Sequence, residues 1–251
     1  MKKRLHARMF WEIVSPLFLY FIITALTLVA LDFLMLAMPQ YLKSMVFRQL
    51  ISSIVVFFFL WTTYTQNKRE KTGVTKKAVC ISLLIGVCFA IAWNNILGLT
   101  GIVNFSEGYR QVSKTFYTGQ IVLEIAALCI VIPIVEELLY RGIIYDRIRS
   151  WLGMKWALVL SAIIFGLVHM NLVQFVYATV FGVVLAFMTE KTGNFYAAAI
   201  AHMAANFTSV LRAETTVFSF LDKSSMVMFV ITILFFIISA VCIRWFQNLD
   251  S

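Results

Sequence analysis

The chain has 251 residues, of which 61% are apolar and 13% are charged, and its mean hydropathy is +0.89. Soluble domains are about half apolar and about a quarter charged, so this composition excludes a water-soluble globular protein. The net charge of +9 comes from Lys and Arg in short clusters between apolar runs, a pattern that does not favour nucleic-acid binding.

Long apolar runs predict an all-α, polytopic transmembrane helix bundle of about eight spans. A span needs roughly 20 apolar residues, so eight spans would use about 160 positions. The remaining segments are too short for a second folded domain, and we expect residues 1–251 to form a single integral membrane domain. The polar stretches at 65–77 and 100–119 predict loops. The predicted spans are residues 13–38, 45–65, 78–99, 119–140, 155–171, 172–189, 194–211 and 226–244.

The Lys and Arg residues predict which span ends face the cytoplasm, because positive charge beside a span is retained there. With both termini inside, the inner segments hold fifteen of the 21 basic residues and the outer segments hold six. We therefore expect a multi-pass protein of the bacterial cytoplasmic membrane with both termini cytoplasmic. The inner residues are Lys2, Lys3, Arg4, Arg8, Lys68, Arg69, Lys71, Lys76, Lys77, Arg141, Arg147, Arg149, Lys155, Lys191 and Arg244; the outer residues are Lys43, Arg48, Arg110, Lys114, Arg212 and Lys223.

Ionisable side chains within a bilayer are costly, so those inside the predicted spans are candidates for function. Two of the three histidines of the chain are among them. Four of the polar residues have no partner in a motif, and for these we expect simple contacts between helices. These four are Asp32, Asn94, Asn95 and Glu124; the others are Glu136, Glu137, Arg141, His169, His202 and Asn206.

The segment EELLYR at 136–141 places two carboxylates and a guanidinium on one helix. Glu137 and Arg141 are i,i+4 neighbours, so Arg141 can hold Glu137 as a carboxylate. Glu136 points about 100° around the helix and can take the separate role of a base. The alternative is that the segment is only the solvated end of its span, with Arg141 reaching the headgroups.

Two further helices carry the histidines. His169 follows Phe165 by one turn, and His202 precedes Asn206 by one turn within an alanine-rich run. Small residues allow helices to pack closely, which would place His202 and Asn206 in a protein interior rather than in lipid. The alternative is a structural pair that only hydrogen-bonds a neighbouring span.

Together, these side chains could activate water for peptide hydrolysis in two ways. Glu136, His169 and His202 could bind one divalent metal such as zinc, which lowers the pKa of bound water. Without a metal, Glu136 would be the base and His169 would assist it. His202 and Asn206 would then donate hydrogen bonds to the oxyanion. No HExxH motif is present, so the cofactor stays open between one divalent metal and none.

The segments EELLYR at 136–141, FGLVH at 165–169 and HMAAN at 202–206 resemble the motifs EExxxR, FxxxH and HxxxN/D of the CPBP family of intramembrane proteases. That family contains type II CAAX prenyl endopeptidases and bacteriocin-processing or self-immunity proteins. The resemblance covers about 119–211, the expected protease core, and implies an endopeptidase acting on a peptide or lipidated protein. It implies Glu136, Glu137, His169, His202 and Asn206 as the catalytic group, with Arg141 and Phe165 as structural support.

Two other functions stay open on the sequence: a proton-coupled transporter that relays protons through the same side chains, and a non-enzymatic immunity or scaffold protein. For the protease, we expect a substrate presented at the cytoplasmic face.

The predicted spans raise one geometric difficulty. Glu136 lies near the inner end of its span, whereas His169 lies fourteen residues, or about 21 Å of helix, beyond Lys155. The two residues meet if the span that carries Glu136 is displaced or tilted, or if the span that carries His169 is short. Asn171 would suit an early break of the latter span.

Overall fold

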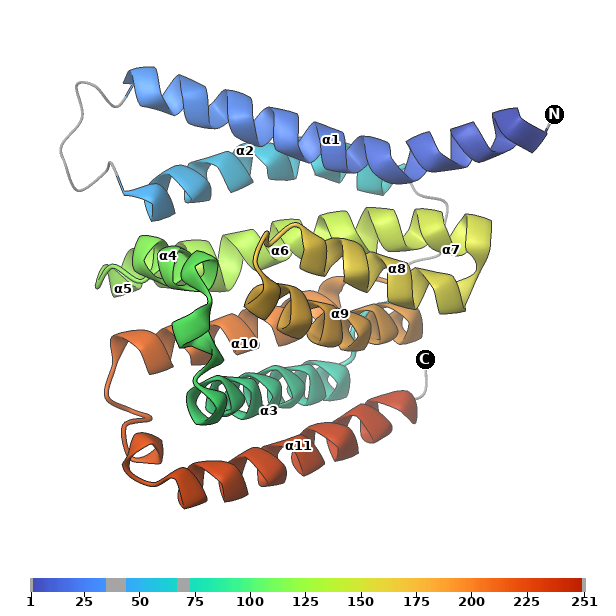
Figure 1. The fold of residues 1–251 in the computed structure, drawn as a ribbon. Coiled ribbons are helices and arrows are strands. Elements are labelled where there is room, and N and C mark those ends of the chain that lie inside the picture. Colours follow the sequence, from blue (N-terminus) through green and yellow to red (C-terminus); the bar gives the residue numbers. More distant parts are fainter. Residues whose placement is uncertain (1, 35–43, 67–72, 250–251) are drawn as a thin grey trace.

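The computed structural model describes residues 2–34, 44–66 and 73–249, and these residues form helices with no strand among them. Figure 1 shows the longer helices packed side by side, with both termini of the chain at the same end of the bundle. We call this end the terminal end. The helices are α1 (Lys2–Leu34), α2 (Met45–Thr65), α3 (Lys76–Thr100), α4 (Glu107–Phe116), α5 (Ile121–Glu124), α6 (Ile132–Glu137), α7 (Asp146–Leu152), α8 (Met154–Leu167), α9 (Leu172–Thr192), α10 (Tyr196–Glu214) and α11 (Ser225–Gln247).

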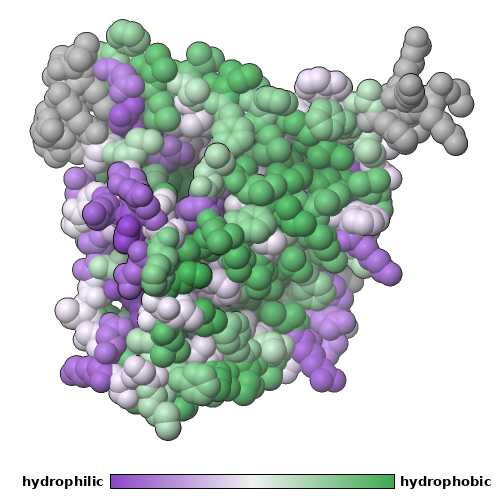
Figure 2. Space-filling view, in the orientation of Figure 1, coloured by the Kyte–Doolittle hydropathy of each residue, from purple (hydrophilic) through white to green (hydrophobic). Residues whose placement is uncertain are grey.

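The chain is a multi-pass integral membrane protein, as its composition predicts. In the described residues, five helices are long and apolar enough to cross a bilayer. Figure 2 shows a mainly hydrophobic middle, with hydrophilic residues gathered toward the two ends of the bundle. The total of eight spans and the cytoplasmic termini stay predictions, and residues 35–43 and 67–72, with their four basic residues, lie outside the described part. The five helices are Ala7–Leu34, Met45–Thr65, Lys76–Thr100, Leu172–Thr192 and Ser225–Gln247.

The helix that carries both glutamates is longer than predicted. It runs without a break from Ile121 to Leu152, through α5, α6, α7 and the two π-helical segments Ile125–Val131 and Leu138–Tyr145. The predicted end at 140 was therefore wrong, and Glu136 lies near the middle of the helix. The difficulty of bringing Glu136 and His169 together is partly removed by this extension.

The remaining part of the difficulty is removed by α8, which is short. It ends at Leu167 after 14 residues, and four residues separate it from the start of α9 at Leu172. The backbone N–H of Gln174 donates to Asn171 Oδ1 at 2.9 Å, so Asn171 caps α9. The early break expected at Asn171 is confirmed, and it leaves His169 in a turn near mid-bundle.

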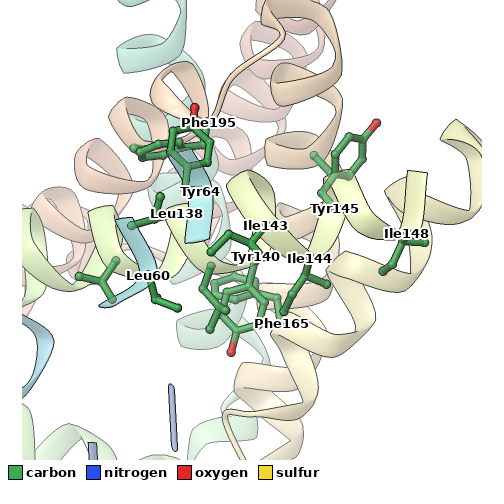
Figure 3. Packing of buried hydrophobic residues seen from close by; sticks show 14 of the residues in the cluster. Leu60, Tyr64, Leu138, Tyr140, Ile143, Ile144, Tyr145, Ile148, Phe165 and Phe195 are labelled. Carbon is green, nitrogen blue, oxygen red and sulfur yellow. The ribbon is translucent and has the colours of Figure 1, made fainter. Parts of the chain in front are cut away.

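The core packs most tightly around the second half of the long helix (Figure 3). Leu138, Ile143 and Ile144 are fully buried there against Leu60 of α2 and Phe165 of α8. Because lipid tails are as apolar as these side chains, this core is stabilised by close packing rather than by escape from water.

Three of the four isolated polar residues connect helices, as expected. Asp32 pairs with Arg48 of α2 at 2.6 Å, Asn94 donates to Ser209 of α10 at 3.0 Å, and Arg212 of α10 donates to Asn95 at 2.7 Å. The expectation was wrong for Glu124. Its Oε1 accepts from two backbone N–H groups and one hydroxyl at Thr118 and Gln120, directly before its own helix.

Helices α3 and α10 cross with their backbones in contact at Gly86. A Cβ added there would lie 2.0 Å from the carbonyl oxygen of Ala201 and 3.0 Å from Ala204 Cβ. The small residues predicted to allow close packing therefore do so on both helices.

Substitution Gly86→Ala should force α3 and α10 apart and lower the free energy of unfolding by about 1–3 kcal/mol. The measurement is the thermal unfolding midpoint in detergent micelles. Gly73→Ala is the matched control, because nothing lies within 4 Å of a Cβ at that position. Equal midpoints for the two variants would show that the crossing is not close-packed.

Candidate functional site

A cavity of about 690 Å³ lies where α3, α4, α6, α9 and α10 meet. Glu136, His169, His202 and Asn206 all line it, although they come from three different stretches of the chain. Phe165 also lines the cavity, whereas Glu137 and Arg141 are fully buried behind it. The predicted site residues thus lie in one place, divided into a cavity wall and a buried layer.

The buried layer is an ion pair with a third partner. Arg141 Nη1 donates to Glu137 Oε1 at 2.9 Å, and both side chains are 0% exposed. Arg141 Nη2 also donates to the carbonyl oxygen of Gly182 on α9 at 3.1 Å. The alternative in which Arg141 reaches the lipid headgroups is therefore wrong, because its guanidinium is enclosed by protein on every side.

Glu137 orients His202 as well as balancing Arg141. Nδ1 of His202 lies 2.9 Å from Glu137 Oε1, and a carboxylate can only accept, so Nδ1 carries the hydrogen. Nε2 of the same ring is then turned toward Glu136, whose Oε2 lies 3.8 Å away. A carboxylate that fixes the tautomer and direction of a histidine is a common arrangement in active sites.

The two adjacent glutamates are in different surroundings. The side chain of Glu136 is 18% exposed and faces the cavity, whereas that of Glu137 is completely enclosed. The cause is the rotation of about 100° between neighbours on a helix. Of the two carboxylates, only that of Glu136 is therefore placed to contact water or substrate.

His169 is oriented by the backbone of its own helix end. Its Nδ1 lies 2.9 Å from the carbonyl oxygen of Phe165, which can only accept, so Nδ1 is again the donor. Nε2 is left as the nitrogen available to the cavity. Asn171 Nδ2 donates to the carbonyl oxygen of His169 at 3.0 Å and so fixes the turn that carries it.

Phe165 connects the two histidines with the buried layer. Its ring centroid lies 5.1 Å from that of His169 and 5.7 Å from that of His202, both edge to face. The Arg141 guanidinium carbon lies 4.4 Å from the same centroid, which is a cation–π contact. Phe165 therefore contacts both histidines and Arg141, and its role as structural support stays a prediction.

Asn206 stabilises an irregularity of the long helix. Its Nδ2 donates to the carbonyl oxygen of Leu128 at 2.8 Å, within the π-helical segment. In a π register this carbonyl would accept from residue 133, which is Pro133 and has no N–H. One N–H of the amide therefore replaces the missing donor, and the second N–H remains for the cavity that Asn206 lines.

The residues present do not form a ready metal site. Within residues 2–34, 44–66 and 73–249, no group of three His, Cys, Asp or Glu side chains is placed to hold one ion. We therefore derive no step through a metal.

The sequence pattern missed one wall of the cavity. The segment predicted as a loop at 100–119 contains α4, whose residues Tyr109, Val112, Ser113 and Phe116 line the cavity. Their i, i+3, i+4, i+7 spacing was a readable signal for an amphipathic helix. Gln174 and Tyr177 of α9 also line the cavity, and Gln174 was visible as a polar residue in an apolar run.

The segment that contains this site is similar to known proteins. Residues 118–208 match the family described as "Type II CAAX prenyl endopeptidase Rce1-like". The chain is 30% identical to the Bacillus subtilis (strain 168) protein named "Putative membrane peptidase YdiL" over 180 residues, covering 68% of this chain and 72% of that protein. It is 25% identical to the "UPF0177 protein YxdF" of Lactococcus lactis subsp. lactis (strain IL1403) over 161 residues, covering 61% and 86%. No solved structure is significantly similar.

Substitution Arg141→Met should strongly destabilise the protein, by roughly 3–5 kcal/mol, because it leaves Glu137 as a buried carboxylate without its counter-ion. Arg8→Met is the matched control. It removes an i,i+4 pair with Glu12 whose arginine side chain is 73% exposed, and should cost about 0–1 kcal/mol. Thermal unfolding in detergent measures both. Similar melting of the two variants would contradict a constraining role for the buried pair.

Substitution Asn206→Ala should cost about 0.6–1.7 kcal/mol, the range of hydrogen bonds between membrane helices. In a Pro133→Ala background the cost should be smaller, because the restored N–H can donate to Leu128. A double-mutant cycle of unfolding free energies measures the difference. Strict additivity would mean that Asn206 does not replace the missing donor.

Proposed function

The chain belongs to the Rce1-like, type II CAAX prenyl endopeptidase family of membrane proteases, and on this premise we propose that its cavity is the active site of a glutamate-dependent intramembrane endopeptidase. The proposed reaction is hydrolysis of a peptide bond in a membrane-associated substrate. A lipidated CAAX-like tail, a leader peptide and another membrane protein are the substrate types that such a site could accept.

The division between the two glutamates carries the proposal. Among the described residues, no hydrogen bond holds the Glu136 carboxylate, which faces the cavity, whereas Glu137 is bonded to Arg141 and His202. A base must reach the water that it activates, and Glu136 meets this requirement. Glu137 belongs to the catalytic group expected from the sequence. We assign it the supporting role of holding the Arg141 and His202 side chains.

In the proposed mechanism, Glu136 removes a proton from a water molecule in the cavity. His169 is neutral, with its hydrogen on Nδ1, so Nε2 can accept from the same water and direct it toward the substrate carbonyl. Moving one proton to Glu136 produces hydroxide at the carbonyl carbon, and Glu136 later returns the proton to the leaving amine.

The oxyanion that develops on the substrate carbonyl requires hydrogen-bond donors in the cavity. His202, which Glu137 holds through Nδ1, is proposed as one donor through Nε2. The second N–H of the Asn206 amide is the other donor. Removing one donor of this type typically reduces the rate by about 10²–10³-fold.

The test is cleavage of a quenched fluorescent peptide library by purified protein in detergent. Substitution Glu136→Gln should lower cleavage by about 10²–10⁴-fold, the usual contribution of a general base, without changing the unfolding midpoint. Glu214→Gln, at the end of α10 beside the mouth of the cavity and outside its lining, is the matched control. Cleavage at wild-type rates by Glu136→Gln would refute the proposal.

Two further arms separate the remaining functions. Activity that a chelator removes and added zinc restores would replace the proposed mechanism with a metal-dependent one. No cleavage by the wild type, together with uptake driven by a pH gradient in proteoliposomes, would favour a transporter. A cellular phenotype that survives Glu136→Ala would favour a non-enzymatic immunity or scaffold role.

A further inference from the structure

We propose that the cavity receives its substrate from the extracytoplasmic side of the membrane, so that the cleaved bond belongs to an exported peptide or to the outer segment of a membrane protein. The inference rests on the proposed function only in treating the bound peptide as a substrate. It rests on separate observations for the side of entry: where the cavity opens, where it is closed, and how the basic residues are distributed.

The cavity opens at the end of the bundle opposite the terminal end. The exposed residues that line it are Gly98, Asn104 and Ala213, which lie at or just beyond the ends of α3 and α10. Both helix ends lie away from the N and C labels in Figure 1. From His202 to Ala213 is eleven residues of α10, so the mouth lies about 16 Å from the buried end of the cavity.

Toward the terminal end the cavity is closed by the buried layer. Arg141 is fully enclosed there, and a Cβ added at Gly182 would lie 2.9 Å from its Nη2 and 3.1 Å from the backbone of Ala162. Beyond this layer, Tyr145 and Ile148 are 0% and 1% exposed. A peptide therefore has no passage between Glu136 and the terminal end.

The distribution of charge identifies the terminal end as cytoplasmic. Among the basic residues of the described part of the chain, with the buried Arg141 set aside, eleven lie in segments at that end and five at the other end. Positive charge near short loops is retained in the cytoplasm. The mouth of the cavity is then extracytoplasmic, and the substrate presentation expected from the sequence is reversed.

Helix α4 forms one wall of the mouth. The face that lines the cavity carries Tyr109, Val112, Ser113 and Phe116, while the opposite face is exposed and includes Glu107, Arg110 and Lys114. A Cβ at Gly108 would lie 3.1 Å from Asn171 Cβ, so α4 closely approaches the turn that carries His169. An amphipathic helix with its polar face in water is expected at a membrane surface.

The lining between the mouth and Glu136 suits an extended, uncharged peptide. Asn94, Gln174 and Ser209 offer donors and acceptors for a peptide backbone, and Trp93 and Phe181 offer apolar surface for side chains.

The side of entry can be tested without any catalysis. Single cysteines are introduced as Ser113→Cys on the cavity face of α4 and Ser150→Cys on the exposed surface of α7, at the terminal end. Cys80→Ala removes the exposed native thiol, since Cys88, Cys129 and Cys242 are buried. A membrane-impermeant maleimide is then applied to intact bacterial cells and to permeabilised cells.

We expect Ser113→Cys to be labelled in intact cells and Ser150→Cys only after permeabilisation. The reverse pattern would overturn the proposal. Labelling of Ser150→Cys in cells whose membrane is shown to be intact by a separate marker would also overturn it. A thiol at 113 that stays unlabelled even after permeabilisation would also overturn it, because the cavity would not open there. Adding Glu136→Gln should leave the labelling pattern unchanged.

An experiment with sealed vesicles distinguishes failure of this proposal from failure of the proposed protease function. Quenched peptides that carry a membrane-impermeant sulfonated dye are supplied outside right-side-out and inside-out vesicles. Cleavage by right-side-out vesicles alone supports extracytoplasmic entry, and cleavage by inside-out vesicles alone overturns it. Absence of cleavage in both, and after detergent, would count against the protease function while the labelling result still decided the side.

Discussion

The structure depends on placing a guanidinium and a carboxylate, Arg141 and Glu137, where neither lipid nor water can reach them. A charge in this position is tolerated when protein groups supply its partner and further contacts, although Arg141 Nε and Glu137 Oε2 have no hydrogen-bond partner among the described residues. Gly182 supplies a carbonyl, Phe165 supplies an aromatic face and His202 supplies a ring nitrogen. This need brings α6, α8, α9 and α10 to one point, and the same contacts position the side chains that line the cavity.

The cavity can hold reactive groups because the buried layer provides its floor. Glu136 differs from its neighbour by one position in sequence, yet it faces an open space rather than a counter-ion. Irregular helix geometry surrounds it, with π-helical segments on both sides of α6 and a proline at its start. Such segments are frequent at functional sites, because they redirect side chains at the expense of regular backbone bonding. Here Asn206 restores one of the bonds that is lost.

Much of this architecture could be predicted from periodicity and from the cost of polar groups in lipid. The apolar runs predicted where the long helices lie, although α1 begins eleven residues before the predicted start, and Asn171 predicted the early break before α9. The long helix was cut at 140 because Arg141 looked like the beginning of a polar end, whereas the tertiary contacts bury it completely. Helix α4 was missed because ten residues with an exposed charged face resemble a loop in a hydropathy profile.

The sequence by itself determined that the chain is an all-helical membrane protein, and it determined which few polar residues needed an explanation. Both follow from local chemistry, since hydropathy, helical spacing and the cost of a buried charge can be evaluated one segment at a time. The tertiary structure decided which glutamate faces the cavity, which way each histidine is turned and at which end the cavity opens. These depend on contacts between residues far apart in the chain, such as Glu137 and His202, 65 positions apart, which no local pattern contains.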